Sequence, residues 1–214
     1  MATATLEKIK EATKGLTDVY SGLKLGLGAL NETFGRLIRF FKSALDAYAQ
    51  NEQAVNRLNT ALKSQGFYSK QYSDSLVNLA IALQKTSTFS DEAIIETMRL
   101  LTTFGLAGKQ LEDTSRIVMD FAVGRLDGDL RTATILLGKA WQGQTEALKR
   151  YGITIDSATP PTERFAAISK EITRSYGGSA AAELETYSGK VKALGLAFDE
   201  VMEKIGKLVL GPAQ

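Results

Sequence analysis

Two side chains that many enzymes use as nucleophile and general base, cysteine and histidine, are missing from this sequence. Its 214 residues include no cysteine and no histidine, which excludes disulfide bonds, Cys/His zinc sites and Ser-His-Asp catalysis. Neighbouring carboxylates remain at Asp91-Glu92 and Asp199-Glu200. Nothing in the sequence places a nucleophile beside them, and adjacent acids on a helix usually form a solvated face. We therefore predict no catalytic residues and no enzymatic activity.

Two further patterns resemble ligand-binding loops but lack essential parts. Glycine precedes lysine at four places, as in phosphate-binding loops, yet no pair has both the earlier glycine and the following Ser or Thr that triphosphate binding requires. Asp127-Gly128-Asp129 looks like a calcium loop without its later bidentate carboxylate. Helix capping is the better interpretation of these aspartates. We therefore predict no cofactor and no metal site.

The charge balance and the apolar runs also limit the partners. The 26 Lys and Arg residues against 24 Asp and Glu leave a formal charge of only +2, so no specific nucleic-acid partner is predicted. The most apolar short run, residues 23–30, falls well short of the roughly 20 apolar residues that a membrane-spanning helix needs. The residues after Met1 do not resemble a signal peptide, because they lead directly into charged side chains. We expect a soluble product made in the cytoplasm.

A heptad pattern predicts a long amphipathic helix over residues 1–63. Apolar residues, interrupted by Thr13 and Asn51, recur at alternating steps of three and four from Ile9 to Leu62, which is the spacing of a coiled-coil seam. Glycines at positions 22, 26 and 28 favour a kink or break there, since each costs about 1 kcal/mol in a helix interior. A single helix cannot bury such a stripe by itself, so the pattern predicts a partner.

Residues 64–178 predict a compact module of shorter helices. Ser90 before Asp91 and Glu92 is an N-cap with an acidic first turn, and Gly105 ends that helix. The other predicted helices are residues 111–123 followed by Gly124 and Asp127-Gly128 as stop signals, residues 130–141, and a helix that opens at Thr159-Pro160-Pro161 and ends at Gly177-Gly178. Residues 152–156 alternate like a strand but are too few to form a sheet.

A second heptad runs from Leu184 to Leu208 in the C-terminal segment, residues 179–214, and Gly211-Pro212 ends it. The predicted fold is all-α, with a long heptad-bearing N-terminal helix, a central helical module and a C-terminal amphipathic helix. The positions that we predict to mediate self-association are Leu16, Leu23, Leu27, Leu30, Phe34, Leu37, Phe41, Val191, Leu194, Phe198, Val201 and Ile205.

Short motifs follow one another through the second half of the chain. They are Leu100-Leu101-Thr102-Thr103-Phe104-Gly105, Val118-Met119-Asp120-Phe121-Ala122, Leu136-Leu137-Gly138-Lys139-Ala140-Trp141, Leu148-Lys149-Arg150-Tyr151-Gly152-Ile153, Gly177-Gly178-Ser179-Ala180 and Ser188-Gly189-Lys190. In order and spacing this set resembles the conserved helical region of phage tail tape measure proteins. The positions that carry the likeness best are Gly105, Asp120, Leu137, Gly138, Lys139, Ala140, Gly152 and Ile153.

The resemblance implies a structural protein of a tailed phage or prophage. Such proteins lie in the lumen of the virion tail tube, set its length, and leave it when the genome is delivered. The implied partners are further copies of the same chain, tail tube proteins and tail assembly chaperones, with transient contact to the host membrane. The implied location during assembly is the host cytoplasm. The family has no common catalytic residues to carry over.

Two other functions remain open from the sequence. The glycine-rich apolar run at residues 23–30 allows a membrane-active channel former, which liposome leakage would reveal. A helical adaptor or chaperone-like binding module unrelated to phages is the other alternative. Neighbouring tail-tube and baseplate genes would favour the tape measure interpretation over the adaptor.

Overall fold

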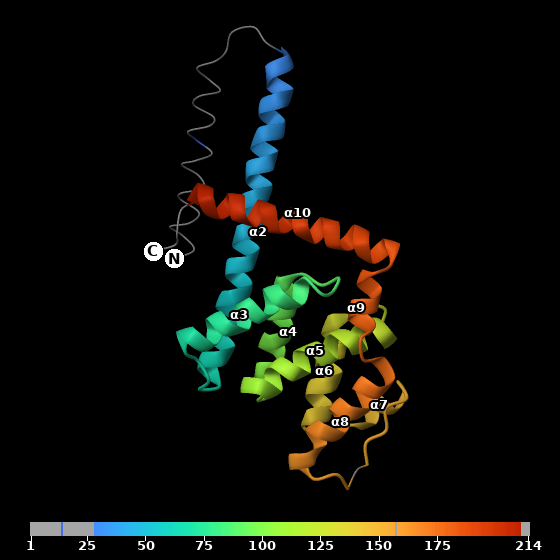
Figure 1. Cartoon of the computed structure of the whole chain (residues 1–214). Helices are drawn as coiled ribbons and strands as arrows, with labels where there is room; N and C mark the ends of the chain where they lie inside the picture. The colour runs from blue at the N-terminus through green and yellow to red at the C-terminus, as the bar shows by residue number, and fades with distance from the viewer. Residues whose placement is uncertain (1–13, 15–27, 157, 211–214) are drawn as a thin grey trace. The chain divides into compact units, whose positions relative to one another are not determined.

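The computed structural model describes residues 14, 28–156 and 158–210, and within these residues it contains α-helices and no β-strand (Figure 1). The predicted all-α class is therefore confirmed. The helices are α2 (Gly28–Ser64), α3 (Lys70–Gln84), α4 (Asp91–Thr103), α5 (Gly108–Arg125), α6 (Leu130–Trp141), α7 (Glu146–Lys149), α8 (Pro161–Tyr176), α9 (Ser179–Leu184) and α10 (Tyr187–Leu210). The predicted break between Gly22 and Gly28 lies outside the described residues, and α2 begins at Gly28.

The chain divides into two units by its internal contacts. One unit comprises the chain up to Gln50 together with the chain from Phe198 onward, and the other comprises Asn51–Ala197. Both α2 and α10 therefore contribute residues to each unit. We call Asn51–Ala197 the central unit and the remainder the terminal unit.

The central unit is built around α5, which contacts α4, α6, α8 and α9. Helix α4 also packs on α3 and α6 (Figure 1). Phe121 of α5 is fully buried, and its ring meets Tyr151 and Tyr176 at centroid distances of 5.6 and 5.7 Å. Other buried apolar side chains of this core are Leu58, Leu62, Leu76, Ile94, Ile95, Met98, Leu101, Leu111, Leu148 and Ile153.

Several helix starts form where the local sequence predicts them. The Ser90 hydroxyl accepts a hydrogen bond from the backbone N–H of Ala93 at the start of α4. The Asp129 carboxylate does the same for the Thr132 N–H, 2.9 Å away, at the start of α6. Helix α8 begins at Pro161, where the missing N–H costs no hydrogen bond. These predicted N-termini are confirmed, and so is the capping interpretation of Asp129.

Two predicted boundaries are wrong. Gly124 does not end a helix but lies in the last turn of α5, where an added Cβ would crowd the Tyr176 ring and the Ser179 hydroxyl. The C-terminal heptad does not form one helix from Leu184, because α9 ends at Leu184 and α10 starts at Tyr187. Thr186 makes the break, since its hydroxyl oxygen accepts a hydrogen bond from the Gly189 N–H at 2.9 Å.

The segment that alternates like a strand in the sequence is an irregular connection between α7 and α8. Ile153 and Ile155 are buried, whereas Thr154 between them is exposed. The alternation thus reflects two side chains that anchor a loop to the core, and the segment forms no sheet.

In the terminal unit, Gly206 of α10 lies directly against the backbone of α2. An added Cβ at Gly206 would overlap the Ala44 carbonyl and touch Cβ of Tyr48. Ala44 itself is fully buried. The two helices therefore approach closely because small residues meet at their contact.

Candidate interaction surface

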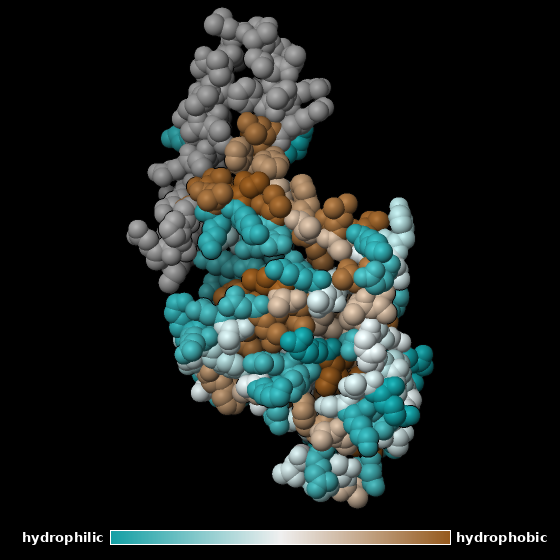
Figure 2. Space-filling view, viewed as in Figure 1, coloured by the Kyte–Doolittle hydropathy of each residue, from teal (hydrophilic) through white to brown (hydrophobic). Residues whose placement is uncertain are grey.

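An unbroken heptad row of apolar residues runs along α10. Its members are Tyr187, Val191, Leu194, Phe198, Val201, Ile205 and Leu208. All except the half-buried Ile205 are between 51% and 87% exposed. Apolar residues lie along this helix in Figure 2. A run of large exposed side chains at heptad spacing is what one partner of a helix pair presents, and we call it the α10 row.

Polar contacts within the central unit hold the first turns of α10. Glu183 of α9 accepts hydrogen bonds from the Lys192 ammonium at 2.8 Å and from the Thr88 hydroxyl at 2.9 Å. The hydrogen bond from Lys192 is the largest cause that lowers the pKa of Glu183 below its ordinary value. Gly189 lies so close to the Glu183 carbonyl that a Cβ would overlap it. These contacts fix the first turns of α10 on α9.

The predicted self-association residues fall into three groups. Val191, Leu194, Phe198, Val201 and Ile205 all belong to the α10 row. In α2, Leu37 is exposed and Phe41 is half-buried. The rest are outside what the structure describes, because Leu16, Leu23 and Leu27 precede α2, and the side chains of Leu30 and Phe34 are not described within it.

The residues that carry the family likeness form turns and core contacts. Gly105 and Gly152 adopt positive φ angles of 89° and 79°, which favour glycine. Leu137, Ala140 and Ile153 are buried. Lys139 is exposed. The positions that make up the motifs thus shape the central unit, apart from the lysine at its surface.

Asp120 and Gly138 have more specific structural roles. The Asp120 carboxylate accepts hydrogen bonds from the backbone N–H groups of Gly178 and Ala180, each at 3.0 Å. The Phe104 ring covers Gly138 so closely that a Cβ there would overlap it. Both contacts join elements distant in the sequence, so local patterns do not reveal them.

The glycines of the four Gly-Lys pairs also have structural roles. Gly108 starts α5 with a φ of 54°. Gly138, Gly189 and Gly206 each permit a close contact with another element. The backbone and packing roles of these glycines account for the four Gly-Lys pairs, so a phosphate-binding loop is not needed to explain them.

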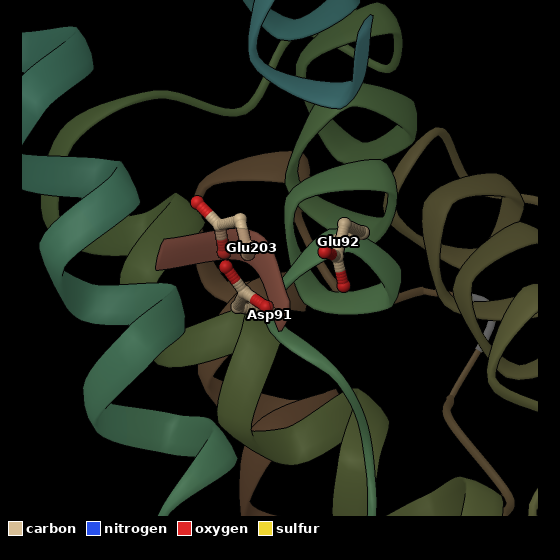
Figure 3. Close-up of side chains that lie close together, drawn as sticks. All are labelled: Asp91, Glu92 and Glu203. Atoms are coloured by element: carbon tan, nitrogen blue, oxygen red, sulfur yellow. The ribbon is translucent and has the colours of Figure 1, made fainter. Parts of the chain in front are cut away.

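Asp91 and Glu92 lie on the first turn of α4 (Figure 3). Glu203, drawn with them, belongs to the terminal unit. An Asp91 carboxylate oxygen accepts a hydrogen bond from the Asn51 side-chain amide at 2.9 Å. The Asp91 backbone N–H donates to the side-chain oxygen of Gln84 at 2.6 Å. Carboxylates here are stabilised by the N-terminal end of the helix dipole, so the pair has a structural role at the α4 N-terminus.

Sequence reasoning missed the Thr186 cap. The available signal was a threonine three residues before Gly189, immediately ahead of an apolar heptad, which is an ordinary helix-start pattern. The continuous heptad spacing across Leu184 and Tyr187 concealed it.

A scan against protein-family models and searches of curated proteins and of solved structures found no match to this chain. Among the helices of the described residues, none combines the length and apolarity that crossing a membrane requires.

Proposed function

We propose that this chain is a non-catalytic structural protein that self-associates through the α10 row. The single observation that carries this proposal is that six apolar side chains at heptad spacing stand exposed on one helix. A heptad row is complementary to a second copy of itself, because its knobs fit the holes between the same residues of the facing helix.

The free energy gained by burying the α10 row is comparable with the cost of association. Fully burying an exposed Val, Leu or Phe side chain gains about 1.5–3 kcal/mol. A row of this length therefore offsets much or all of an association cost of about 4–15 kcal/mol. The 24 residues of α10 correspond to a helix of about 36 Å, which is long enough for three heptads.

We further propose that the self-association serves a phage or prophage tail, with the chain acting as a tail tape measure protein or a segment of one. The support is the ordered set of motifs from Leu100 to Lys190. A helical ruler also has a simple physical basis, since its length grows by about 1.5 Å per residue. In this role the chain contacts tail tube and tail assembly chaperone proteins and takes part in genome delivery.

Light scattering coupled to size-exclusion chromatography tests the self-association. We expect the wild type to be oligomeric at micromolar concentration and Leu194→Asp to be monomeric, because a buried charge at the centre of the row is strongly unfavourable. Lys207→Asp, on the same helix outside the row, is the matched control and should behave as the wild type. A monomeric wild type would overturn the proposal.

The tape measure role needs a separate experiment in the phage or prophage that carries the gene. Adding or removing one heptad in the helical segment that α2 occupies should change the tail length by about 10 Å per seven residues. Electron micrographs of purified tails would measure it. Tails of unchanged length after several inserted heptads would exclude a ruler, even if the chain self-associates.

A further inference from the structure

An open groove with two arginines lies between α2 and α4, within the central unit. It has a volume of about 430 Å³, and its polar lining residues are Asn56, Arg57, Thr60, Ser64, Arg99 and Thr103. The first four lie on one face of α2 and the last two on α4. The α10 row uses none of these residues, and the family-like motifs include only Thr103.

Arg99 is held in place by Glu96, one helical turn earlier. Nε and Nη2 of Arg99 donate to the two carboxylate oxygens of Glu96 at 2.7 and 2.6 Å. The hydrogen bond from Arg99 is the largest cause that lowers the pKa of Glu96, so this carboxylate stays ionised at neutral pH. The pair uses one edge of the guanidinium and leaves the Nη1 edge, with its N–H groups, for a second acceptor.

Both charged side chains that line this groove, Arg57 and Arg99, are positive. Arg131 lies 3.7 Å from Glu96 Oε1, and the charge of Arg57 also acts on the Glu96 carboxylate. Three guanidinium groups therefore act on the Glu96 carboxylate. Because the charged side chains of the groove lining are both positive, the lining favours an anion.

The neutral groups define which donors face such an anion. The hydroxyls of Thr60, Ser64 and Thr103 donate to the helix carbonyls of Asn56, Ala61 and Leu100. Their protons are thus already used. The donors that remain along the groove are the two guanidinium groups and the Asn56 side-chain amide.

We propose that this groove binds a phosphate group, with Arg57 and Arg99 as its two charged contacts. Guanidinium groups match the geometry of phosphate oxygens and form charge-assisted hydrogen bonds to them. A preoriented arginine loses less side-chain freedom on binding, which is the role of Glu96. The phosphate belongs either to a small soluble molecule or to the headgroup of an anionic lipid.

Equilibrium dialysis of the full chain against inorganic phosphate, at constant ionic strength, is the first arm of the test. We expect saturable binding that weakens by about tenfold or more in Arg57→Gln, as the loss of one charge-assisted contact implies. Arg57→Lys should retain part of the binding because it keeps the charge. Thermal unfolding followed by circular dichroism verifies that both variants remain folded.

Arg174→Gln is the matched control, because Arg174 forms the same kind of ion pair one turn along a helix, with Glu171 at 2.7 Å, away from the groove. It should bind phosphate as the wild type does. The second arm is co-sedimentation with phosphatidic acid vesicles. If binding depends on Arg57 only with the vesicles and not with inorganic phosphate, the proposed site is supported and its phosphate comes from a lipid headgroup. Absence of Arg57-dependent binding in both arms, with Arg57→Gln folded, overturns the proposal.

Discussion

The carboxylate of Asp120, in the C-terminal half of α5, accepts a hydrogen bond from the backbone N–H of Gly178, 58 residues further along the chain. Its other oxygen accepts from the N–H of Ala180. Helix α9 starts at Ser179 without a cap from its own N-terminal residue. Asp120 therefore supplies in three dimensions the cap that usually comes from the adjacent sequence.

Replacing Asp120 should destabilise the central unit. Asp120→Ala removes both hydrogen bonds to the α9 N-terminus, and we expect a loss of about 1–2 kcal/mol in the free energy of unfolding. Denaturant unfolding monitored by circular dichroism measures it. Asp113→Ala on the same helix is the control, since its ion pair with Lys109 is exposed and worth no more than about 1 kcal/mol. Equal losses in the two variants would show that Asp120 has no special capping role.

The contact between Gly138 and Phe104 predicts that alanine is not tolerated at position 138. The added methyl group overlaps the Phe104 ring, and overpacking of this kind costs about 1–3 kcal/mol. The opposite result is expected for Gly195→Ala in α10, where no atom lies within 4 Å of the added Cβ. That change should be neutral or stabilise by up to about 1 kcal/mol. A Gly138→Ala variant as stable as the wild type would contradict the close packing.

Acidification should weaken the anchoring of α10. Because the folded-state pKa of Glu183 is lowered from 4.5, its contribution to stability is fully present above that value and is lost as the pH falls through the lower folded-state pKa. We expect Glu183→Gln to flatten the pH dependence of the unfolding free energy below about pH 4.5. Thermal or denaturant unfolding at several pH values between neutrality and pH 3 measures the slope. An unchanged slope in the variant would mean that Glu183 does not contribute.

The single tryptophan of the sequence reports on the packing of α6 against α8. The rings of Trp141 and Phe165 meet edge to face with centroids 4.6 Å apart. Phe165→Leu should cost about 0.5–1.5 kcal/mol beyond the lost burial and change the Trp141 emission of the folded protein. Phe67→Leu, in the connection before α3, serves as the comparison and should leave the emission unchanged. Identical emission spectra for wild type and Phe165→Leu would argue against the ring contact.

Local sequence was sufficient for the helical class and for several helix starts. Ser90, Asp129 and Pro161 act on N–H groups within three residues of themselves, so their effect does not depend on the rest of the fold. The heptad spacing of α10 is local in the same sense. The groove arginines show the limit, because Arg57 and Arg99 come together only when α2 packs beside α4.

The residues alone indicate that this protein is helical, that Cys- and His-dependent chemistry is excluded, and that its last long helix carries an apolar row. Contacts between distant elements are needed to show that Gly124 continues α5 beneath Tyr176, that Asp120 caps α9, and that the apolar row of α10 stays exposed. Propensity, capping and periodicity act over only one or two helical turns. Burial and charge clustering depend on which distant surfaces meet.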